Sequence, residues 1–385
     1  MVAGADVELI CLREKSGELK RETINGVRVR RVPMARRRGG VLGYLYRYCA
    51  FLVASSAIIS ARLLTRRYDL VYVHNMPDFL VLCGLLPKMF GAKIILDLHD
   101  PMPELMQTIF ELPPHARSVQ LLRGVERWSM KLADAVVTVN AACARLFASR
   151  SCSAKKITVV MNSPDETIFE ARPAQKPSGA TNSKPFVIMY HGSIVERNGL
   201  ALAMEAFARV RPELPSAELH IYGARNALLE RVMETAQARG LQDSVQYLGQ
   251  KPLEQIVDAI ASCDVGIIPN QRSIFTELNT PTRIFEYLAL GKPVIAPKAS
   301  GITDYFDENS LIFFELGNAE DLARKIAMVY RNREEVAEIT RRGQEIHFAH
   351  TWRVEKTQLT RLVEGMVSGR LSAFHATATE GPQER

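Results

Sequence analysis

A single carboxylate lies inside an otherwise apolar segment in the second half of the sequence. The segment is TPTRIFEYLALGKPVIA, residues 280–296, and the carboxylate belongs to Glu286. Burying a carboxylate without a partner costs several kcal/mol, roughly. Either Arg283, one helical turn earlier, neutralises Glu286, or a ligand does.

The same segment predicts a short helix followed by a buried strand. Thr280 is the expected N-cap, and Pro281 suits the first helical position. Gly291 stands where a helix end needs a residue that is free to adopt a positive φ. Residues 294–296 then form an apolar strand.

Polar side chains and glycines also collect where other apolar strands are expected to end. In the first half they are His74, Asn75, Asp97, His99 and Asp100, and in the second half Gly192, Gly223, Gly249, Asn270 and residues 278–286. In doubly wound sheets, ligands bind beyond the carboxyl ends of the strands. We therefore expect both sets to face one cleft.

Near-continuous apolar strands alternate with helices along the chain, which is typical of parallel sheets covered on both faces. Strands are predicted at 5–12, 26–32, 68–75, 92–100, 133–140, 156–162, 186–192, 217–223, 245–249, 264–270, 293–297 and 310–315. The predicted fold class is α/β, with two doubly wound Rossmann-like domains.

The chain of 385 residues is long enough for two domains, and its composition suggests their limits. Residues 1–170 form the N-terminal domain, 171–185 a linker rich in Pro, Ser and Ala, and 186–345 the C-terminal domain. Residues 346–368 form a C-terminal helix, for which a return to the N-terminal domain is one option. The tail, residues 369–385, is expected to be disordered.

The net charge of +7 is unevenly distributed, since residues 1–67 hold fourteen Lys and Arg against five Asp and Glu. The uncharged run from Tyr48 to Ala61 is shorter than the roughly 20 residues that span a bilayer. A buried helix, or a buried helix that also touches a membrane surface, fits this stretch better. Nucleic acid is not an expected partner, because no aromatic-rich strand motif or reading helix accompanies the charge.

The six cysteines are scattered and form no CxxC motif or metal-ligand spacing, which favours reduced thiols in a cytoplasmic protein. The opening MVAGADVELICL runs directly into a strand-like segment, so we expect no signal peptide. The sequence contains no Asp-x-Asp motif, and DLHD (residues 97–100) has no further ligands at metal spacing. Neither a metal nor a cofactor is expected.

These motifs together resemble the family 4 glycosyltransferases of the GT-B fold. The C-terminal resemblance covers about residues 186–367 and rests on HGSIVERNG, ELHIYG, VQYLG, DVGIIP and PTRIFEYLALGKPVIA. The N-terminal resemblance is to the bacterial surface-polysaccharide branch, through YDLVYVHNMPDFLVLCGLLPKMFGAKIILDLHDPMPELM. The family resemblance as a whole implies that a hexosyl group is transferred from a nucleotide-diphosphate sugar with retention of configuration and without a metal. It assigns no enzyme nucleophile.

The resemblance also implies a donor site. In this family a glutamate placed like Glu286 accepts hydrogen bonds from the ribose hydroxyls of the donor, which suits an acceptor-only group. A helix N-terminus nearby offers free N–H groups to the diphosphate. The other expected donor-binding residues are Arg283, Arg197, Asn198, Gly192, Asn279, Thr280 and Thr282.

On the acceptor side, the resemblance suggests that His99 approaches the donor sugar or the attacking acceptor, with Asp100 beside it. Asp100 and Glu104 are expected to bind acceptor hydroxyls, although a helix cap would explain Asp100 nearly as well. His74 and Asn75 are further acceptor-side candidates.

The sequence departs from the family pattern in three ways. Leu278 stands near the place of a second family glutamate, with Glu277 one residue away. Ser193 and Asn198 stand where the family usually has phosphate-binding Arg and Lys. The family's opening strand, Gly-rich loop and helix have no counterpart before GADVELICL. As an explanation, a misplaced start is favoured over a truncated remnant. Loss of this central strand would expose the edges of neighbouring strands.

The acceptor implied by the resemblance is a lipid-linked or saccharide molecule of surface polysaccharide biosynthesis. The basic and apolar stretch 36–67 agrees with peripheral contact at the inner face of the cell membrane, since each basic residue near anionic lipid contributes about 1 kcal/mol. A catalytically degenerate relic that binds nucleotide or a partner is an alternative, and a nucleotide-sugar 2-epimerase fits less well.

Overall fold

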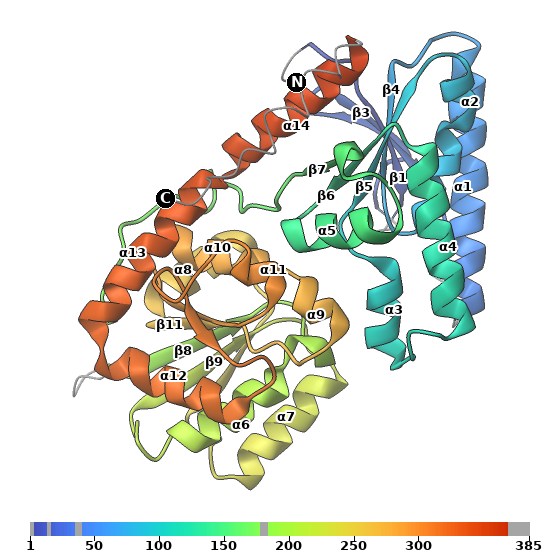
Figure 1. Cartoon of the computed structure of the whole chain (residues 1–385). Coiled ribbons are helices and arrows are strands. Elements are labelled where there is room, and N and C mark those ends of the chain that lie inside the picture. Colours follow the sequence, from blue (N-terminus) through green and yellow to red (C-terminus); the bar gives the residue numbers. More distant parts are fainter. Residues whose placement is uncertain (1–3, 14–16, 35–40, 178–183, 369–385) are drawn as a thin grey trace.

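The protein is described here by a computed structural model that covers residues 4–13, 17–34, 41–177 and 184–368. It has the predicted α/β fold, with one Rossmann-like domain in each half of the chain (Figure 1). The tail that was expected to be disordered, residues 369–385, lies outside the described residues.

The C-terminal domain is built on six parallel strands in the order β10-β9-β8-β11-β12-β13. Their bounds are β8 Phe186–His191, β9 Ala217–Tyr222, β10 Val245–Gly249, β11 Val265–Ile267, β12 Val294–Pro297 and β13 Ile312–Phe314. The strand order reverses between β8 and β11. Ligands of doubly wound sheets bind at such a switch point, beyond the carboxyl ends of the strands.

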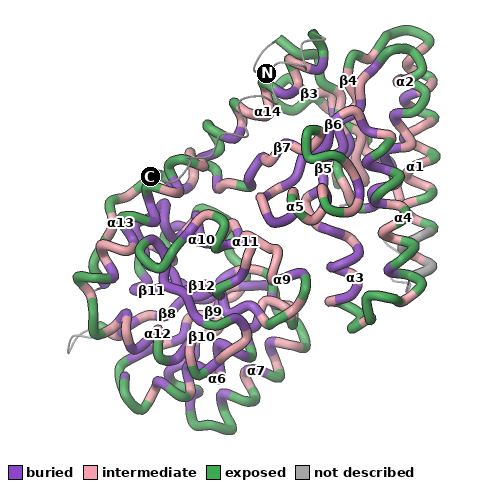
Figure 2. The backbone as a smooth tube through the Cα atoms, viewed as in Figure 1, coloured by how far each residue is buried: buried purple, intermediate pink, exposed green. Residues whose placement is uncertain are grey.

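Helices cover both faces of this sheet and enclose two apolar cores, because the strands carry apolar side chains on both sides. Figure 2 shows most of this sheet in the colour of buried residues. One core includes Phe207 and Ile326, and the other includes Phe285 and Phe306. The helices are α6 Leu200–Val210, α7 Ala227–Ala238, α8 Leu253–Ser262, α9 Ile274–Leu278, α10 Thr282–Ala289, α11 Ser300–Thr303, α12 Ala319–Arg331 and α13 Arg333–Ala349, with a 3₁₀ turn, η3, at Glu196–Asn198.

The strands of the N-terminal domain form two sheets. A parallel sheet contains β4 Leu70–His74, β5 Lys93–Leu98, β6 Ala135–Thr138 and β7 Ile157–Val159, in that order. A second sheet contains β1 Glu8–Leu12, β3 Val27–Val32 and β2 Arg21–Ile24, where β2 is an antiparallel strand that the sequence did not predict. Among the described strands no ladder joins β1 to β4, and Val7 and Leu9 remain exposed, as expected for an unpaired strand edge.

The helices of this domain are α1 Val41–Leu63, η1 Asp78–Gly84, α2 Leu85–Met89, α3 Met102–Phe110, α4 Arg117–Leu132 and α5 Ala141–Arg150, with a 3₁₀ turn, η2, at Ala154–Lys156. The long α1 packs on η1 and α2. Among the helices that the structure describes, none combines the length and the apolarity that crossing a bilayer would require.

The chain passes between the two domains twice. The first passage follows β7, and its start is not a free linker, because Arg172 N–H donates to Ala289 O and Gln175 N–H donates to Gly291 O. Gly291 has φ of +69°, and a side chain there would collide with Pro173 O, so only glycine fits. The second passage is α14, Trp352–Val367, which carries Leu362 and Met366 back onto the N-terminal sheet.

Candidate active site

The carboxyl end of β8 lies at the switch point of the C-terminal sheet and brings His191 and Gly192 next to helix α10. His191 is buried, and its two ring nitrogens contact side chains of that helix. Nε2 lies 2.6 Å from Glu286 Oε2, and Nδ1 lies 2.8 Å from the hydroxyl of Tyr287. The partner of the unusual carboxylate is therefore a histidine, and not Arg283.

Glu286 is only partly enclosed, with 16% of its side chain exposed. Burial lowers the pKa of His191, although the contact with Glu286 opposes that shift. Nε2–H of His191 donates to the Glu286 carboxylate, and the Tyr287 hydroxyl beside Nδ1 donates to Met189 O at 3.0 Å. Glu286 Oε1 makes no hydrogen bond within the described part of the chain. One oxygen of the carboxylate is thus held in place, and the other is available to a ligand.

Arg283 lies against the strand end and contacts its backbone. Its Nη1 donates to His191 O at 2.6 Å, and its guanidinium carbon lies 5.5 Å from the centre of the Tyr190 ring. Gly192 has φ of +121°, and a side chain there would come within 3.3–3.5 Å of Arg283. Arg283 and Gly192 thus form one wall of the site next to Glu286.

The predicted cap of helix α10 was wrong by one residue. The N-cap is Pro281, which has no side-chain cap, and Thr282 is the first helical residue. The Thr280 hydroxyl instead donates to Gly301 O and accepts from Asn140 Nδ2 of the N-terminal domain. Because this hydroxyl already has two hydrogen-bond partners, Thr280 could contact a nucleotide sugar only through its backbone N–H.

The loop after β8 carries Arg197 and Asn198, two residues predicted to bind the nucleotide sugar, and their side chains have different surroundings. Asn198 Nδ2 donates to Ser193 O at 2.7 Å, so this side chain braces its own loop. The Arg197 guanidinium carbon lies 5.7 Å from the Phe275 ring centre. Burial raises the pKa of Asp100, and the charges of His99 and Arg197 partly oppose that rise. Arg197 is therefore packed on α9 and close enough to Asp100 of the N-terminal domain to affect it electrostatically.

Leu278, which stands near the place of a family glutamate, packs against the apolar core of the N-terminal domain. Its carbonyl accepts from Asn140 Nδ2 at 2.8 Å. The adjacent Glu277 accepts from Ser300 N–H at 3.2 Å. The segment before α10 is therefore a domain contact, and its side chains are largely engaged.

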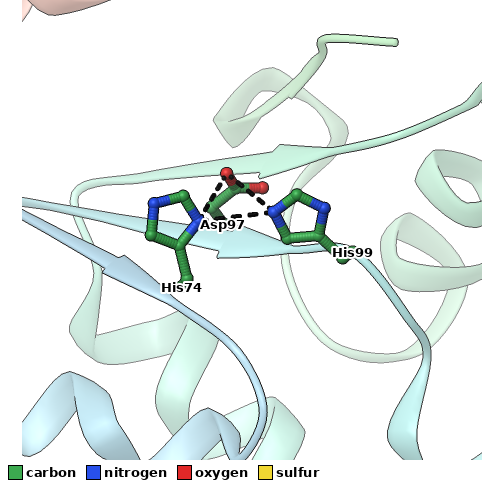
Figure 3. Close-up of side chains that lie close together, drawn as sticks. All are labelled: His74, Asp97 and His99. Atoms are coloured by element: carbon green, nitrogen blue, oxygen red, sulfur yellow. Dashed lines mark hydrogen bonds and ion pairs between the residues drawn. The ribbon is translucent and has the colours of Figure 1, made fainter. Parts of the chain in front are cut away.

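In the N-terminal domain, two neighbouring strands bring three polar side chains together (Figure 3). His74 and Asp97 are register partners on β4 and β5, and His99 follows β5. Asp97 Oδ2 lies 3.2 Å from His74 Nδ1 and 3.4 Å from His99 Nε2, and these two nitrogens are 3.3 Å apart. Tyr72 donates to the same oxygen at 2.9 Å.

These contacts change the proton affinity of the cluster. The hydrogen bond to Asp97 raises the pKa of His99 and outweighs the opposing effect of its partial burial. Burial alone would raise the pKa of Asp97, but the hydrogen bonds from His74 and His99 hold it well below its usual range. Asp97 is therefore a buried anion next to the exposed imidazole of His74 and the half-exposed imidazole of His99.

Two further candidates lie in the loops that follow β4 and β5. Asn75 bridges these loops, because its Oδ1 accepts from His99 N–H and its Nδ2 donates to Asp100 O. Asp100 itself makes no side-chain hydrogen bond within the described residues, and the N-cap of α3 is Pro101 without a side-chain cap. The helix-cap explanation of Asp100 was wrong, and burial raises the pKa of its carboxyl.

The expectation that Glu104 binds acceptor hydroxyls was wrong. Its side chain is 3% exposed and is paired at 2.6 and 2.8 Å with the guanidinium of Arg150, which also pairs with Glu126. Both carboxylate oxygens of Glu104 are thus taken, and a buried ion pair of this kind is part of the fold.

Sequence reasoning missed the roles of His191, Asp97 and Tyr72. His191 ends a predicted strand, so the rule that selected His74 and His99 could also have selected it. Asp97 was noted beside His99 but was not assigned a role. Tyr72 is two residues before His74 on the same face of β4, a relation that becomes visible only once the register with β5 is known.

Both domains match models of glycosyltransferase families. Residues 2–163 match a "glycosyl transferase 4-like domain", and residues 171–346 match "glycosyl transferases group 1". The amylovoran biosynthesis glycosyltransferase AmsK of Erwinia amylovora is 29% identical over 128 residues, which are 33% of this chain and 31% of AmsK. The 2-deoxystreptamine glucosyltransferase of Streptomyces kanamyceticus is 25% identical over 330 residues, or 83% of each chain.

Solved structures agree with this assignment at the level of the fold. Sucrose-phosphate synthase of Thermosynechococcus elongatus superposes with a TM-score of 0.74 at 16% identity, covering 95% of this chain and 90% of that one. Anabaena HepE in complex with UDP superposes with a TM-score of 0.67 at 16% identity, covering 94% and 100%. The two family models together identify the chain as a glycosyltransferase, and the solved structures agree with the GT-B fold.

Proposed function

We propose that the protein is a retaining, metal-independent hexosyltransferase that moves a sugar from a nucleotide diphosphate to an acceptor hydroxyl. The observation that carries the proposal is the state of Glu286. Its Oε2 is held by His191 at 2.6 Å, while Oε1 is unpaired within the described residues and lies at the switch point of the C-terminal sheet. A carboxylate positioned in this way suits the two hydroxyls of a ribose.

The diphosphate would lie beside this carboxylate. Arg283 and Arg197 supply positive charge, and Gly192 allows the backbone to approach closely. Asn279, Thr280 and Thr282 precede or begin α10, where backbone N–H groups are free to bind phosphate oxygens. Cations and amide dipoles stabilise the charge that develops on a leaving diphosphate.

The sugar and the acceptor would lie toward the N-terminal domain. His99 carries a half-exposed imidazole with a raised pKa, and Asp100 makes no side-chain hydrogen bond within the described residues. The charge of Arg197 acts on the Asp100 carboxyl. We assign His99 to the vicinity of the reacting atoms and Asp100 to a sugar or acceptor hydroxyl. His74 borders the same space, and Asn75 acts through the backbone of His99 and Asp100.

The proposed acceptor is a lipid-linked or saccharide molecule of surface polysaccharide biosynthesis, which the name of the relative AmsK also suggests. Apolar side chains are exposed on α1 and at the end of α2, among them Tyr46, Val53, Met89 and, directly after α2, Phe90. Arg66 follows α1 and is also largely exposed. These features favour peripheral binding at the cytoplasmic face of the membrane.

Product formation tests this function. The purified chain would be screened by thermal shift against UDP, GDP, ADP and dTDP and their sugars, beginning with UDP-glucose because HepE has been solved in complex with it. A ligand at about 100 times its dissociation constant adds roughly 2.7 kcal/mol of stability. The sugar nucleotide that binds would then be supplied with lipid-linked acceptors, and transfer would be followed by mass spectrometry.

A non-catalytic nucleotide-binding relic is the second candidate, since Leu278 replaces a family glutamate and packs in a domain contact. Binding of a nucleotide without hydrolysis or transfer, across all acceptors tested, would favour the relic. Anomeric retention in the product would support the retaining mechanism, and inversion would contradict it.

A further inference from the structure

We propose that His74, Asp97 and His99 form a binding site for a four-coordinate transition-metal ion, and that Zn²⁺ is the ion that it takes. The three residues offer two imidazole nitrogens and one carboxylate oxygen, which are ligand types that zinc accepts. The inference is independent of the sugar-transfer reaction, because it concerns binding of the ion itself.

The geometry of the three ligand atoms carries the proposal. Their separations are 3.2, 3.3 and 3.4 Å, which make a nearly equilateral triangle. Zinc bonds of about 2.0–2.1 Å at tetrahedral angles place neighbouring ligand atoms about 3.3–3.4 Å apart. Octahedral Mg²⁺, with bonds of about 2.0–2.1 Å at right angles, requires only about 2.8–3.0 Å. The triangle thus matches one face of a zinc tetrahedron.

The orientation of the side chains agrees with this assignment. Figure 3 shows His74 Nδ1 and His99 Nε2 pointing toward one another beside the Asp97 carboxylate. Three groups that can each donate an electron pair converge there, and a divalent cation satisfies all of them at once. The fourth position would be held by water or by a substrate oxygen, as in zinc sites that keep an open position.

The surroundings combine access with a buried anion. The side chains of His74 and His99 are 57% and 41% exposed, so an ion can enter from solvent, whereas that of Asp97 is 8% exposed. Tyr72 donates to Asp97 Oδ2 and orients it as a second-layer partner of a metal ligand would. His74 is on β4, whereas Asp97 and His99 are on β5 and directly after it, 23 and 25 residues later in the sequence. This separation explains why no compact metal motif is visible in the sequence.

Occupation of this site would use Nε2 of His99, the same residue that the proposed function places beside the reacting atoms. Zinc would therefore oppose sugar transfer, and metal-free enzyme would be the active form. This consequence rests on the proposed function, whereas zinc binding itself does not.

The test uses the full chain after dialysis against a chelator, titrated with Zn²⁺ by calorimetry and with Co²⁺ by visible absorption. We expect one Zn²⁺ per chain and the intense visible bands of four-coordinate Co²⁺. His74→Ala, a change at an exposed side chain, should weaken binding more than about 100-fold, since even loss of a second-layer partner costs about 10–100-fold. Tyr72→Phe should fall in that smaller range.

His220→Ala is the matched control, because His220 pairs with a single carboxylate, Glu218, at 2.8 Å without a third ligand. It should bind Zn²⁺ as the unmodified chain does. Absence of saturable binding, binding by His74→Ala equal to that of the unmodified chain, or the weak spectrum of six-coordinate Co²⁺ would overturn the proposal. Inhibition of transfer is a separate readout, so inactive protein that still binds zinc would reject the proposed function alone.

Discussion

His191 and His99 each stand at the carboxyl end of a parallel strand, one in each domain, and each pairs with a carboxylate. His191 is 5% exposed, and burial lowers its pKa. His99 has a side chain that is 41% exposed, and its hydrogen bond to Asp97 raises its pKa. The same pairing of residue types thus goes with a lowered imidazole pKa in one domain and a raised imidazole pKa in the other.

Each imidazole has a carboxylate partner that raises its pKa, so the difference in burial accounts for the opposite directions of the two shifts. An enclosed His191 with a lowered pKa can hold Glu286 in place, which suits a binding role. An exposed His99 near a carboxylate can exchange a proton with solvent or substrate, which suits a role near the reaction. Four experiments would break or sharpen this comparison.

The largest expected effect concerns stability. Arg150→Met leaves the buried carboxylates of Glu104 and Glu126 without their shared cation, and loss of one partner of a buried pair costs about 3–5 kcal/mol. Chemical denaturation should show this loss, while nucleotide binding by the folded protein stays unchanged. A loss of nucleotide affinity at full stability would return Glu104 to the candidate site.

His99→Ala should reduce turnover by about 100-fold or more and leave donor affinity nearly unchanged, because a polar group beside the reacting atoms acts mainly in the transition state. Steady-state kinetics and donor titration of the same sample would separate the two effects. His220→Ala serves as the control. Equal losses in turnover and donor binding would give His99 a structural role.

Glu286→Ala should weaken donor binding by about tenfold or more, since a hydrogen bond to a charged group contributes about 1.5–3 kcal/mol. The fold should tolerate the change, because the side chain lies at the edge of the core. Glu286→Gln keeps an acceptor oxygen, so its affinity for the sugar nucleotide should lie between that of Glu286→Ala and that of the unmodified chain. Unchanged affinity in the alanine variant would contradict the ribose assignment.

The smallest effect is a difference in titration, measured by NMR of the imidazole rings in metal-free protein. As the pH falls from 8, His99 should protonate above the usual value of about 6.5, and His191 should stay neutral below it. Protonated His99 then stabilises the fold at low pH, and this contribution is lost as the pH rises through its raised pKa. For His191 the sign is opposite, because the unfolded chain takes up the proton first and stability falls as the pH drops below 6.5. Identical titration of the two histidines would remove the basis of the comparison.

The sequence allowed the fold to be predicted and several candidate site residues to be selected. Apolar strands alternating with helices indicated both Rossmann-like domains, and polar residues at strand ends led to His74, His99 and Gly192. Glu286 was conspicuous because its neighbours are apolar. These are local signals, which a single segment of chain displays by itself.

The remaining features depend on pairing between distant segments. The contact between His191 and Glu286 joins residues 95 positions apart, and the Asp97 cluster requires the register of β4 with β5. Glu104 was misassigned because Arg150, its partner, lies 46 residues away. The antiparallel β2 was missed because its residues, RETI, are polar and mostly exposed.

The double passage of the chain between domains limits how those domains can move. The segment that leaves β7 is tied to α10 and Gly291, and α14 returns to the N-terminal sheet, where Glu355 also accepts from Met161 N–H. Two covalent connections define a hinge axis. Rotation of one domain about the line between the connections strains neither of them, whereas twisting the domains or pulling them apart strains both. Opening and closing of the two domains around a bound sugar nucleotide would therefore follow a single hinge axis. The hydrogen bonds from Asn140 to Leu278 and Thr280 join the domains away from the two connections and would have to break when the domains open.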